Sequence, residues 1–599
     1  MENKKQAIIL SGVAIVALLA LIIGATYAYF RASGNSGSNT DINVTTYTLD
    51  LLSFEMGSDI KINADQTSFA SGKGNATGST FAKAILTANN KTNTATKNYY
   101  MYLNISNNTF TYTQNENTPE LLLTITDVSG NAITSITGLT YKTVIDGKGT
   151  SVSGFDITTK SGLLTLFDNR EITASPTKTE EWNVTVTFVN YNVNQTGNAG
   201  KSFNAKLMIQ QEEYELTLAD ICAGKTLSDC VISQYTGTQG DNALYYHNST
   251  LTNGAGDNSY RYAGGDYVLT EAGKATGATM MIGYNNSVTT ALIDFYCNGT
   301  KQYVGYASSC STSHYYLIKG DTTQYQTYNE ALNASVEKGY LTKDNVKNFV
   351  CFGSDATTCP TENLYRIIGV FNNHVKLIKY DYAKSSLLGT DGDFSQEYTS
   401  NYFSGEQGES PSSNSLYYWN NAGTNTWSAS KLNTVNLNTN FTTNIGTAWA
   451  NKIATTTWKV GGGTYANLRD AVPKTAYQYE VGSSASTTTY DAKIGLMYVS
   501  DYYYSASPSA WTLVGYNSDY TKSYASAKGE NWLYGGGWDW TISRNSDYSY
   551  YAFRVYYYGG VYNSSVFSSV SGVRPSFSLL SSTTYVSGSG SMSDPVRIN

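Results

Sequence analysis

Short stretches in which apolar and polar residues alternate are the feature that most constrains the fold of this chain. The segment 182–189 reads WNVTVTFV, and segments 100–105 and 121–125 follow the same pattern. Successive side chains of a strand point to opposite faces, so each stretch predicts a strand with one buried face. Clusters of Asn, Gly and Ser separate the stretches. We therefore expect an antiparallel β-sandwich over residues 31–212, acting as a spacer.

The composition sets the class of protein. The chain has 599 residues, of which 41% are hydrophobic and 14% charged, so it can build two to four packed domains. It has 52 Tyr and 53 Gly, an alphabet typical of short strands, tight turns and recognition surfaces. The net charge of −7 provides no field that would neutralise phosphates, so we expect no nucleic-acid partner.

The amino terminus predicts export. Lys4 and Lys5 precede an uncharged apolar run from Ala7 to Ala25, and Thr26-Tyr27-Ala28 offers a cleavage site. Lysines on the first side place the amino terminus in the cytoplasm and the rest of the chain outside. Residues 1–30 are thus a signal peptide or a membrane anchor, and the run fits either reading. We expect a cell-surface or membrane-anchored extracellular location.

The segment 24–30, GATYAYF, resembles the signal peptides of the camelysin/TasA-like proteins of Gram-positive bacteria. The resemblance implies cleavage near this point by a dedicated signal peptidase. It also implies a role in surface layers or biofilm fibres. The strand-rich residues that follow are similar to that family in pattern.

A cysteine-containing linker region is predicted at 213–360. An even number of cysteines in an exported chain favours disulfides, and consecutive pairing would close three short loops. Zinc is the competing reading, but the spacings are too wide for zinc knuckles. Residues 330–347 are the clearest helical stretch. The six cysteines are Cys222, Cys230, Cys297, Cys310, Cys351 and Cys359.

The remaining segment, 361–599, predicts an α+β domain. It opens with a hairpin pattern in which 364–371 and 374–380 flank Asn372-Asn373. It closes with an alternating stretch at 573–579, so we expect the first and last strands to pair. Residues 427–432 predict the start of a helix capped by Ser428.

The order of several segments in 361–599 resembles Gram-positive surface domains with a C-type-lectin-like fold. These domains are similar to those of the formylglycine-generating enzymes and of the variable proteins of diversity-generating retroelements. The resemblance implies a compact scaffold whose irregular loops display a binding surface. The chain lacks the Glu-Pro-Asn or Gln-Pro-Asp calcium motif, and no cysteine follows Cys359, so neither calcium-dependent sugar binding nor thiol chemistry is expected. The matching segments are 363–370, 490–498, 531–533, 540–543, 552–555 and 572–575.

An aromatic stretch at 532–567 is the predicted ligand-binding site. Consecutive tyrosines cannot all face one core, so some rings must reach solvent, where they suit a glycan or an extracellular protein. Trp532 and Trp540 are expected in the core. The candidate ligand-binding residues are Trp538, Asn545, Asp547, Tyr548, Tyr550, Tyr551, Tyr556, Tyr557, Tyr558, Tyr562 and Asn563.

A sharper hypothesis is that residues 541–571 are diversified by a retroelement. Adenine-directed mutagenesis of Asn codons yields Tyr, Ser, Asp, Gly, Val and Phe, the residues found between Asn545 and Ser571. The general Tyr bias of the chain is the competing explanation. A template repeat and a reverse transcriptase beside the gene would support diversification.

We expect a binding protein and not an enzyme. The three histidines lie in separate segments outside any catalytic motif, and the Gly triplets at 461–463 and 535–537 lack a phosphate-loop pattern. No cofactor or metal is expected. Two alternatives stay open: a structural subunit of a surface or biofilm fibre, and a glycan-active enzyme that uses Asp539 and Asp547 as its acid pair.

Overall fold

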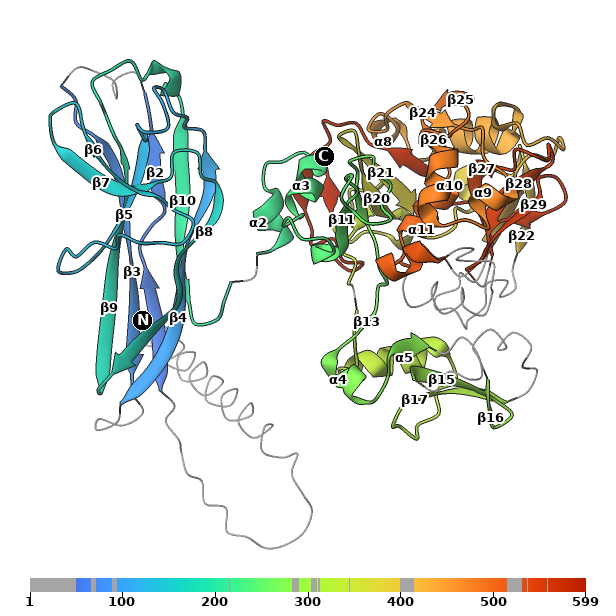
Figure 1. Ribbon diagram of the computed structural model, residues 1–599, viewed down its shortest axis with the longest axis horizontal. Coiled ribbons are helices and arrows are strands. Elements are labelled where there is room, and N and C mark those ends of the chain that lie inside the picture. The colour runs from blue at the N-terminus through green and yellow to red at the C-terminus, as the bar shows by residue number, and fades with distance from the viewer. Residues whose placement is uncertain are drawn as a thin grey trace, which may run out of the picture.

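The computed structural model shows three packed bodies (Figure 1). The described part of the chain is mainly β with many antiparallel sheets, which confirms the predicted multidomain, mainly β architecture. No helix in this part is long and apolar enough to cross a membrane, and the predicted signal or anchor at 1–30 lies outside it. The described residues are 50–65, 72–88, 94–214, 216–282, 290–302, 310, 313–343, 345–398, 414–513, 531–535, 537–556 and 559–599.

The first body is a two-sheet domain. Its two antiparallel sheets enclose one hydrophobic core. One sheet has the order β1 (Leu51–Met56), β3 (Ala76–Thr87), β9 (Thr177–Phe188), β5 (Leu121–Asp127), β7 (Ser151–Asp156) and β6 (Tyr141–Ile145). The other has the order β2 (Ile60–Asn63), β10 (Ser202–Gln210), β4 (Ala95–Asn108) and β8 (Gly162–Ala174).

The alternating pattern sets which side chains of this domain are buried. In β9, Trp182, Val184, Val186 and Phe188 are buried, whereas Asn183 is exposed. The buried Trp182 Nε1 donates to the Tyr99 hydroxyl at 2.9 Å, so its polar atom is satisfied inside the core. The predicted strand therefore forms with the expected face inward.

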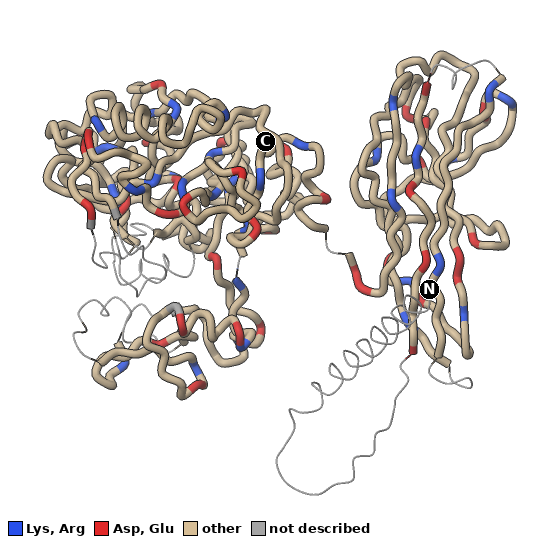
Figure 2. The backbone as a smooth tube through the Cα atoms, turned by 180° about the vertical axis from the view of Figure 1, so that it is seen from behind, with Lys and Arg blue, Asp and Glu red and all other residues tan. Residues whose placement is uncertain are grey.

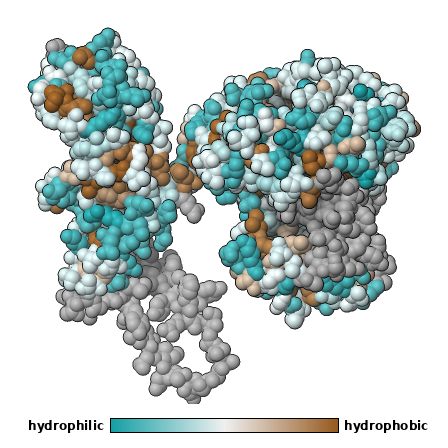
Figure 3. Space-filling view, viewed as in Figure 1, coloured by the Kyte–Doolittle hydropathy of each residue, from teal (hydrophilic) through white to brown (hydrophobic). Residues whose placement is uncertain are grey.

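The surface of the molecule is mostly hydrophilic, with hydrophobic residues gathered in the middle of the two-sheet domain on the face shown (Figure 3). A groove of about 980 Å³ on this domain is lined by residues of β8 and of the segment that leads out of the domain. The backbone N–H of Tyr214 in that segment donates to the Tyr102 hydroxyl at 3.0 Å. The start of the linker is thus held against the sheet.

The second body, the C-terminal domain, is built on a mixed-length sheet of seven strands. Their order is β11 (Leu244–Tyr246), β12 (Tyr260–Tyr262), β20 (Leu364–Phe371), β21 (His374–Lys379), β31 (Ser576–Ser578) and β26 (Ile494–Gly495), and β19 (Phe349–Cys351) also pairs with β20.

The opening hairpin of this sheet forms as predicted. Asn372 and Asn373 join β20 to β21 with φ of 49° and 63°, the left-handed conformation that asparagine tolerates in tight hairpin turns. The second strand of the hairpin, β21, pairs antiparallel with β31 from the closing segment. The beginning and the end of the predicted domain therefore meet in one sheet.

Shorter elements surround this sheet. A three-stranded sheet contains β27 (Asp539–Arg544), β28 (Tyr551–Val555) and β29 (Val561–Ser565). A second has β22 (Phe394–Tyr398), β23 (Asn414–Tyr418) and β30 (Val570–Ser571); two pairs are β24 (Thr456–Lys459) with β25 (Thr489–Ala492), and β32 (Tyr585–Ser587) with β33 (Arg597–Ile598). The helices are α6 (Ser385–Leu388), α7 (Thr442–Asn444), α8 (Thr447–Ala450), α9 (Tyr465–Leu468), α10 (Pro473–Glu480) and α11 (Val499–Tyr504).

The predicted helix at 427–432 was wrong in its form. The chain makes a short 3₁₀ turn at Trp427–Ala429 and then a π-helix at Leu432–Phe441. Ser428 does not cap either element. Ser430 instead donates from its hydroxyl to the Trp419 carbonyl, so the side chain that orders this region sits two residues later.

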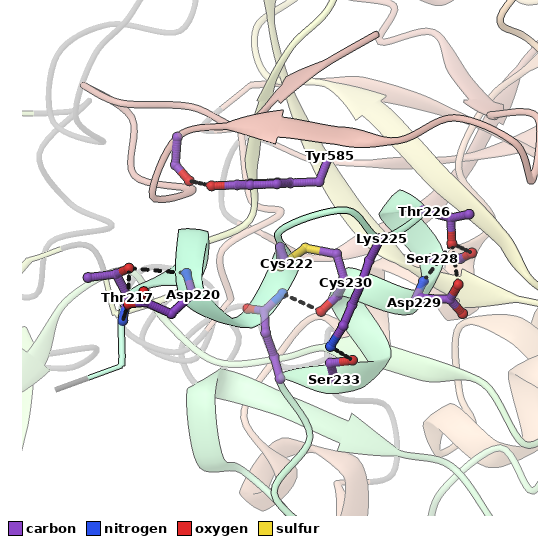
Figure 4. The surroundings of a disulfide bond; sticks show 12 residues. Thr217, Asp220, Cys222, Lys225, Thr226, Ser228, Asp229, Cys230, Ser233 and Tyr585 are labelled. Atoms are coloured by element: carbon purple, nitrogen blue, oxygen red, sulfur yellow. Dashed lines mark hydrogen bonds between the residues drawn. A yellow bond between two sulfur atoms is a disulfide. The ribbon is translucent and has the colours of Figure 1, made fainter. Parts of the chain in front are cut away.

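Residues 216–262 belong to the C-terminal domain, which differs from the predicted division at residue 361. The helices α2 (Leu218–Cys222) and α3 (Leu227–Ser233) bury the Cys222–Cys230 disulfide in the core of that domain. Figure 4 shows this disulfide beside Tyr585, whose backbone N–H donates to the Lys225 carbonyl at 3.1 Å. The end of the chain thus packs against the segment that follows the two-sheet domain.

The third body is a lobe inserted between β12 and β19, with a core of its own. Its elements are β13 (Val268–Leu269), α4 (Glu271–Ala275), β14 (Met280–Ile282), β15 (Ala291–Cys297), β16 (Thr300–Gln302), β17 (His314–Ile318), α5 (Tyr328–Glu337) and β18 (Leu341–Thr342). The helix predicted over 330–347 ends early, because the chain turns at Gly339 (φ 71°) and then enters β18.

All three disulfides link consecutive cysteines, as consecutive pairing predicts. They are Cys222–Cys230, Cys297–Cys310 and Cys351–Cys359, and no described cysteine is free. The predicted disulfides are therefore confirmed. The Cys297–Cys310 bond belongs to the inserted lobe, whereas the other two belong to the C-terminal domain.

Candidate functional site

The predicted site contains a hydrogen-bonded turn between β27 and β28, residues 545–551, which we call the tyrosine turn. The buried Asn425 side chain donates from Nδ2 to the carbonyls of Asn545, Tyr548 and Tyr551 at 2.8, 2.7 and 2.7 Å. The Asn425 backbone N–H also donates to the Ser549 carbonyl at 2.6 Å. One buried side chain thus fixes the backbone along the whole turn.

The rings of the tyrosine turn form an exposed cluster. Tyr548 and Tyr550 are 51% and 40% exposed, and Tyr551 is half-buried. The Tyr550 ring centroid lies 4.5 Å from that of Tyr551, and the Tyr548 centroid lies 6.2 Å from that of Tyr550. The Val566 backbone N–H donates to the Tyr550 carbonyl at 3.0 Å, and the next residue, Phe567, is 45% exposed. Large rings on a fixed backbone suit contact with another molecule.

Asn545 and Asp547 have different places in this turn. Asn545 is fully buried, and its Oδ1 accepts from the Asp547 backbone N–H at 2.8 Å. Asn545 therefore supports the turn and does not face solvent, whereas Asp547 is exposed.

Three other predicted residues, Trp538, Tyr556 and Tyr562, form an arginine–aromatic ladder together with Arg554 and Arg469, which the sequence did not predict. The Arg554 guanidinium carbon lies 4.7 Å from the Trp538 ring and 4.8 Å from the Tyr556 ring. Arg469 lies 4.1 Å from the Tyr562 ring, and the Tyr556 and Tyr562 centroids are 5.5 Å apart. Arg554 and Tyr562 are cross-strand partners, so they share one face of the sheet.

The ladder and the tyrosine turn lie at opposite ends of β28. Tyr551 begins this strand and Tyr556 follows its last residue, which separates them by roughly 16 Å along an extended chain. Asn563 is half-buried opposite Phe553. Tyr557 and Tyr558 lie outside the described residues. The predicted site residues thus divide into two groups.

The two tryptophans expected in the core are buried there. Trp532 and Trp540 are 5% and 0% exposed, and their Nε1 atoms donate to the carbonyls of Tyr262 and Tyr417. Asp539 is also buried, where it pairs with Arg574. Asp539 and Asp547 therefore differ completely in environment, because Asp547 is exposed on the tyrosine turn.

Sequence reasoning missed a charged cavity of about 290 Å³ at β21 and α11. Lys376 Nζ lies 2.5 Å from Asp501 Oδ2, and Arg261 pairs with Asp257 at 2.6 Å. All four line the cavity, whose walls include Trp458, Tyr477 and Tyr498. The sequence signal for this cavity was Lys376 within the stretch HVKLIK. Both faces of this strand, β21, are buried, so the lysine lies inside the domain.

Glu480, the last residue of α10, contacts the first turn of α11 beside this cavity. Its carboxylate accepts from the backbone N–H groups of Val499 and Ser500 at 3.0 and 2.8 Å, and from the Ser543 hydroxyl. Burial raises the pKa of Glu480 to about 7, although these hydrogen bonds oppose the shift. Ser500 lines the cavity, and its side chain and backbone both act to lower the pKa of Glu480. Together these groups can hold or exchange a proton near neutral pH.

The histidines are separate structural residues. His247 is buried against Tyr504 and Trp511, its Nδ1 accepts from the Ala255 N–H at 3.0 Å, and burial lowers its pKa. His374 Nδ1 contacts the Leu579 carbonyl at 2.8 Å. Within the ranges that the structure describes, no three His, Cys, Asp or Glu side chains are grouped to hold a metal ion.

No family model, characterised protein or solved structure is significantly similar to this chain.

Proposed function

We propose that this protein is an exported cell-surface protein that binds an extracellular glycan or protein through the tyrosine turn. In this proposal the two-sheet domain is a β-sandwich spacer of camelysin/TasA-like type, and residues 361–599 form most of a C-type-lectin-like domain. The observation that carries the proposal is an exposed cluster of tyrosines on a backbone held by the buried Asn425. The three disulfides fit an oxidising compartment.

The chemistry of the turn supports recognition. Tyrosine has two side-chain torsions, so it presents a large apolar surface and a hydroxyl at low entropic cost. The fixed backbone lowers that cost further, because little of the turn must be ordered on binding. Retroelement diversification of 541–571 fits a domain that keeps its scaffold and varies exposed positions such as Tyr548 and Tyr550.

A glycan array and a cell-binding screen with the purified protein test this function. We expect the double variant Tyr548→Ser/Tyr550→Ser to lose at least tenfold in affinity, because hot-spot aromatic residues contribute about 2 kcal/mol or more. The matched control is Tyr479→Ser, which removes another exposed tyrosine of the domain. Equal binding by both variants would exclude the tyrosine turn as the binding surface.

A second candidate, a fibre subunit, is favoured by the two edge strands of the larger sheet. Leu51 and Met56 on β1, and Ile145 on β6, are 64%, 45% and 59% exposed. Edge strands that expose apolar residues are templates for pairing with another chain. Electron microscopy of the double tyrosine variant separates the candidates, since a fibre subunit would assemble unchanged.

A further inference from the structure

A second cavity, of about 310 Å³, lies at the end of β21 away from the hairpin turn. Its lining includes Lys379, Tyr365, Asn363 and Leu387, with Asp381 and Lys384 nearer the chain that leaves the strand. One water molecule takes about 30 Å³ in the liquid, so the space suits a molecule of roughly ten non-hydrogen atoms. The cavity is separate from the tyrosine turn and from the charged cavity at Lys376.

Lys379 is the unusual member of this lining. It is 3% exposed, and no residue in the described ranges accepts a hydrogen bond or forms an ion pair with its Nζ. Its Nζ lies 5.7 Å from the Tyr365 ring centroid. By contrast, Lys376 on the same strand pairs with Asp501, and Lys459 donates to the Val481 carbonyl.

The environment favours the neutral amine. Burial lowers the pKa of Lys379 to about 8, and Lys384 lowers it further, while Asp381 and Glu362 act in the opposite direction. Tyr365 contributes no charge, because burial raises the pKa of its hydroxyl. An exposed lysine with a pKa near 10.4 has only about one part in a thousand as free amine near pH 7.5. A far larger fraction of Lys379 is therefore free amine, the nucleophilic form, at neutral pH.

We propose that this cavity is a covalent capture site in which Lys379 condenses reversibly with a small aldehyde. The Nζ lone pair attacks the carbonyl carbon, and the oxygen takes up a proton while nitrogen loses one, which gives a carbinolamine. Loss of the hydroxyl and the remaining N–H proton as water leaves an imine. No oxidant or reductant is needed. Buried lysines of lowered pKa are the ones that serve as Schiff-base amines in proteins.

The polar part of the lining fits a short hydroxyaldehyde. Asn363, Asn444 and Asp381 offer hydrogen-bond groups, while Leu387, Ile445 and Tyr365 offer apolar contact. The open-chain form of a small sugar has both the carbonyl and the hydroxyls that such a lining accommodates.

Trapping with glycolaldehyde tests the proposal. The full chain is treated at pH 7.5 with glycolaldehyde and cyanoborohydride, and peptide mass spectrometry follows the adduct at each lysine. We expect Lys379 to be modified at least tenfold faster than Lys384 at the cavity rim. Its rate should level off above about pH 8, whereas the rate at Lys384 should still rise toward pH 10.

Three controls make the result decisive. Lys379→Met should remove the fast adduct, Lys384→Arg should keep it, and Lys376, which is buried but paired, should stay unmodified. The Tyr548→Ser/Tyr550→Ser variant should label like the parent protein, because this site does not depend on the tyrosine turn. Adducts spread over surface lysines, with Lys379 no faster than Lys384, would overturn the proposal. The pH profile of the unaltered protein decides the matter even if Lys379→Met does not fold.

Discussion

The two-sheet domain and the C-terminal domain are organised in different ways. The first is built from long paired strands, such as the 14 residues of β4 and the 12 of β9, whereas strands of the second have two to eight residues. Among the described residues, every buried lysine and arginine lies in the C-terminal domain. Figure 2 shows basic and acidic residues interspersed along both bodies, so neither domain is made of one charge sign.

This difference shows two ways to fix a β-rich fold. Regular pairing and alternation account for most of the two-sheet domain, since each strand contributes one apolar face to a shared core. In the C-terminal domain, buried cations add contacts between segments that are far apart in the chain. Arg366 binds Asp266 at 2.7 Å, and Arg574 donates from Nε to Asp539 at 2.5 Å and from Nη2 to the Leu533 carbonyl at 2.8 Å.

The largest loss of stability is expected on removing one member of a buried ion pair, and it should be confined to the C-terminal domain. We expect Asp539→Ala to destabilise the C-terminal domain by about 3–5 kcal/mol, because Arg574 would keep its charge inside the core without a partner. Calorimetry should show this domain unfolding earlier while the two-sheet domain is unaffected. A shift of both transitions together would mean that the two domains unfold as one unit.

Replacing the buried Lys379 should have the opposite effect and stabilise the protein. The folded-state pKa of Lys379, about 8, lies below the unfolded value, so stability rises with pH between about 8 and 10.5. Lys379→Met should therefore stabilise the protein below pH 8 by up to about 3 kcal/mol. The difference should vanish near pH 10.5. Urea unfolding at pH 7 and pH 10 measures it, and a pH-independent difference would contradict a buried charge.

Loss of the disulfide in the inserted lobe should have a smaller and local effect. The Cys297–Cys310 bond closes a loop with a sequence separation of 13 residues, so its removal should cost about 2–3 kcal/mol. We expect Cys297→Ser/Cys310→Ser to expose amides of β15 and β17 to hydrogen exchange. Amides of β20 and β21 should keep their protection, and loss there would show that the lobe supports the main sheet.

The smallest effect on stability is expected at the tyrosine turn. Tyr548→Ser/Tyr550→Ser should change the free energy of unfolding by less than about 0.5 kcal/mol, because both rings are exposed. Thermal unfolding checks this.

Asn425→Ala should cost much more, about 1–3 kcal/mol, since three backbone carbonyls would lose their buried donor.

The sequence predicted the elements whose pattern is local. The hairpin around Asn372-Asn373, the alternation of β9 and the consecutive disulfides all depend on residues close together in the chain. It did not predict that residues 216–262 join the C-terminal core, because that depends on pairing between β12 and β20 across more than a hundred residues.

The candidate site was predicted in part for the same reason. Alternation correctly requires some tyrosines to be exposed, and Tyr548 and Tyr550 are. Yet Asn545 and Asn425 are buried, and polarity alone gives no sign of that. Asn545 accepts a hydrogen bond within the turn, whereas Asn425 donates to this turn from 120 residues away. The charged cavity was missed because Arg261, Lys376 and Asp501 come from three distant segments.

The way the chain enters and leaves the inserted lobe bears on whether this lobe can be replaced by another. The chain leaves the main sheet after β12 and returns at Val346, and Arg366 binds both crossings through Asp266 and the Val346 carbonyl. Asn345 adds hydrogen bonds to Gly265 and Asp266 across the same neck. These contacts hold the two ends of the inserted lobe together. A longer, shorter or exchanged lobe would therefore change the entropic cost of folding only slightly. Because the neck is held by Asp266 and Asn345, we expect the residues between these two to be exchangeable without disturbance of the strands on either side.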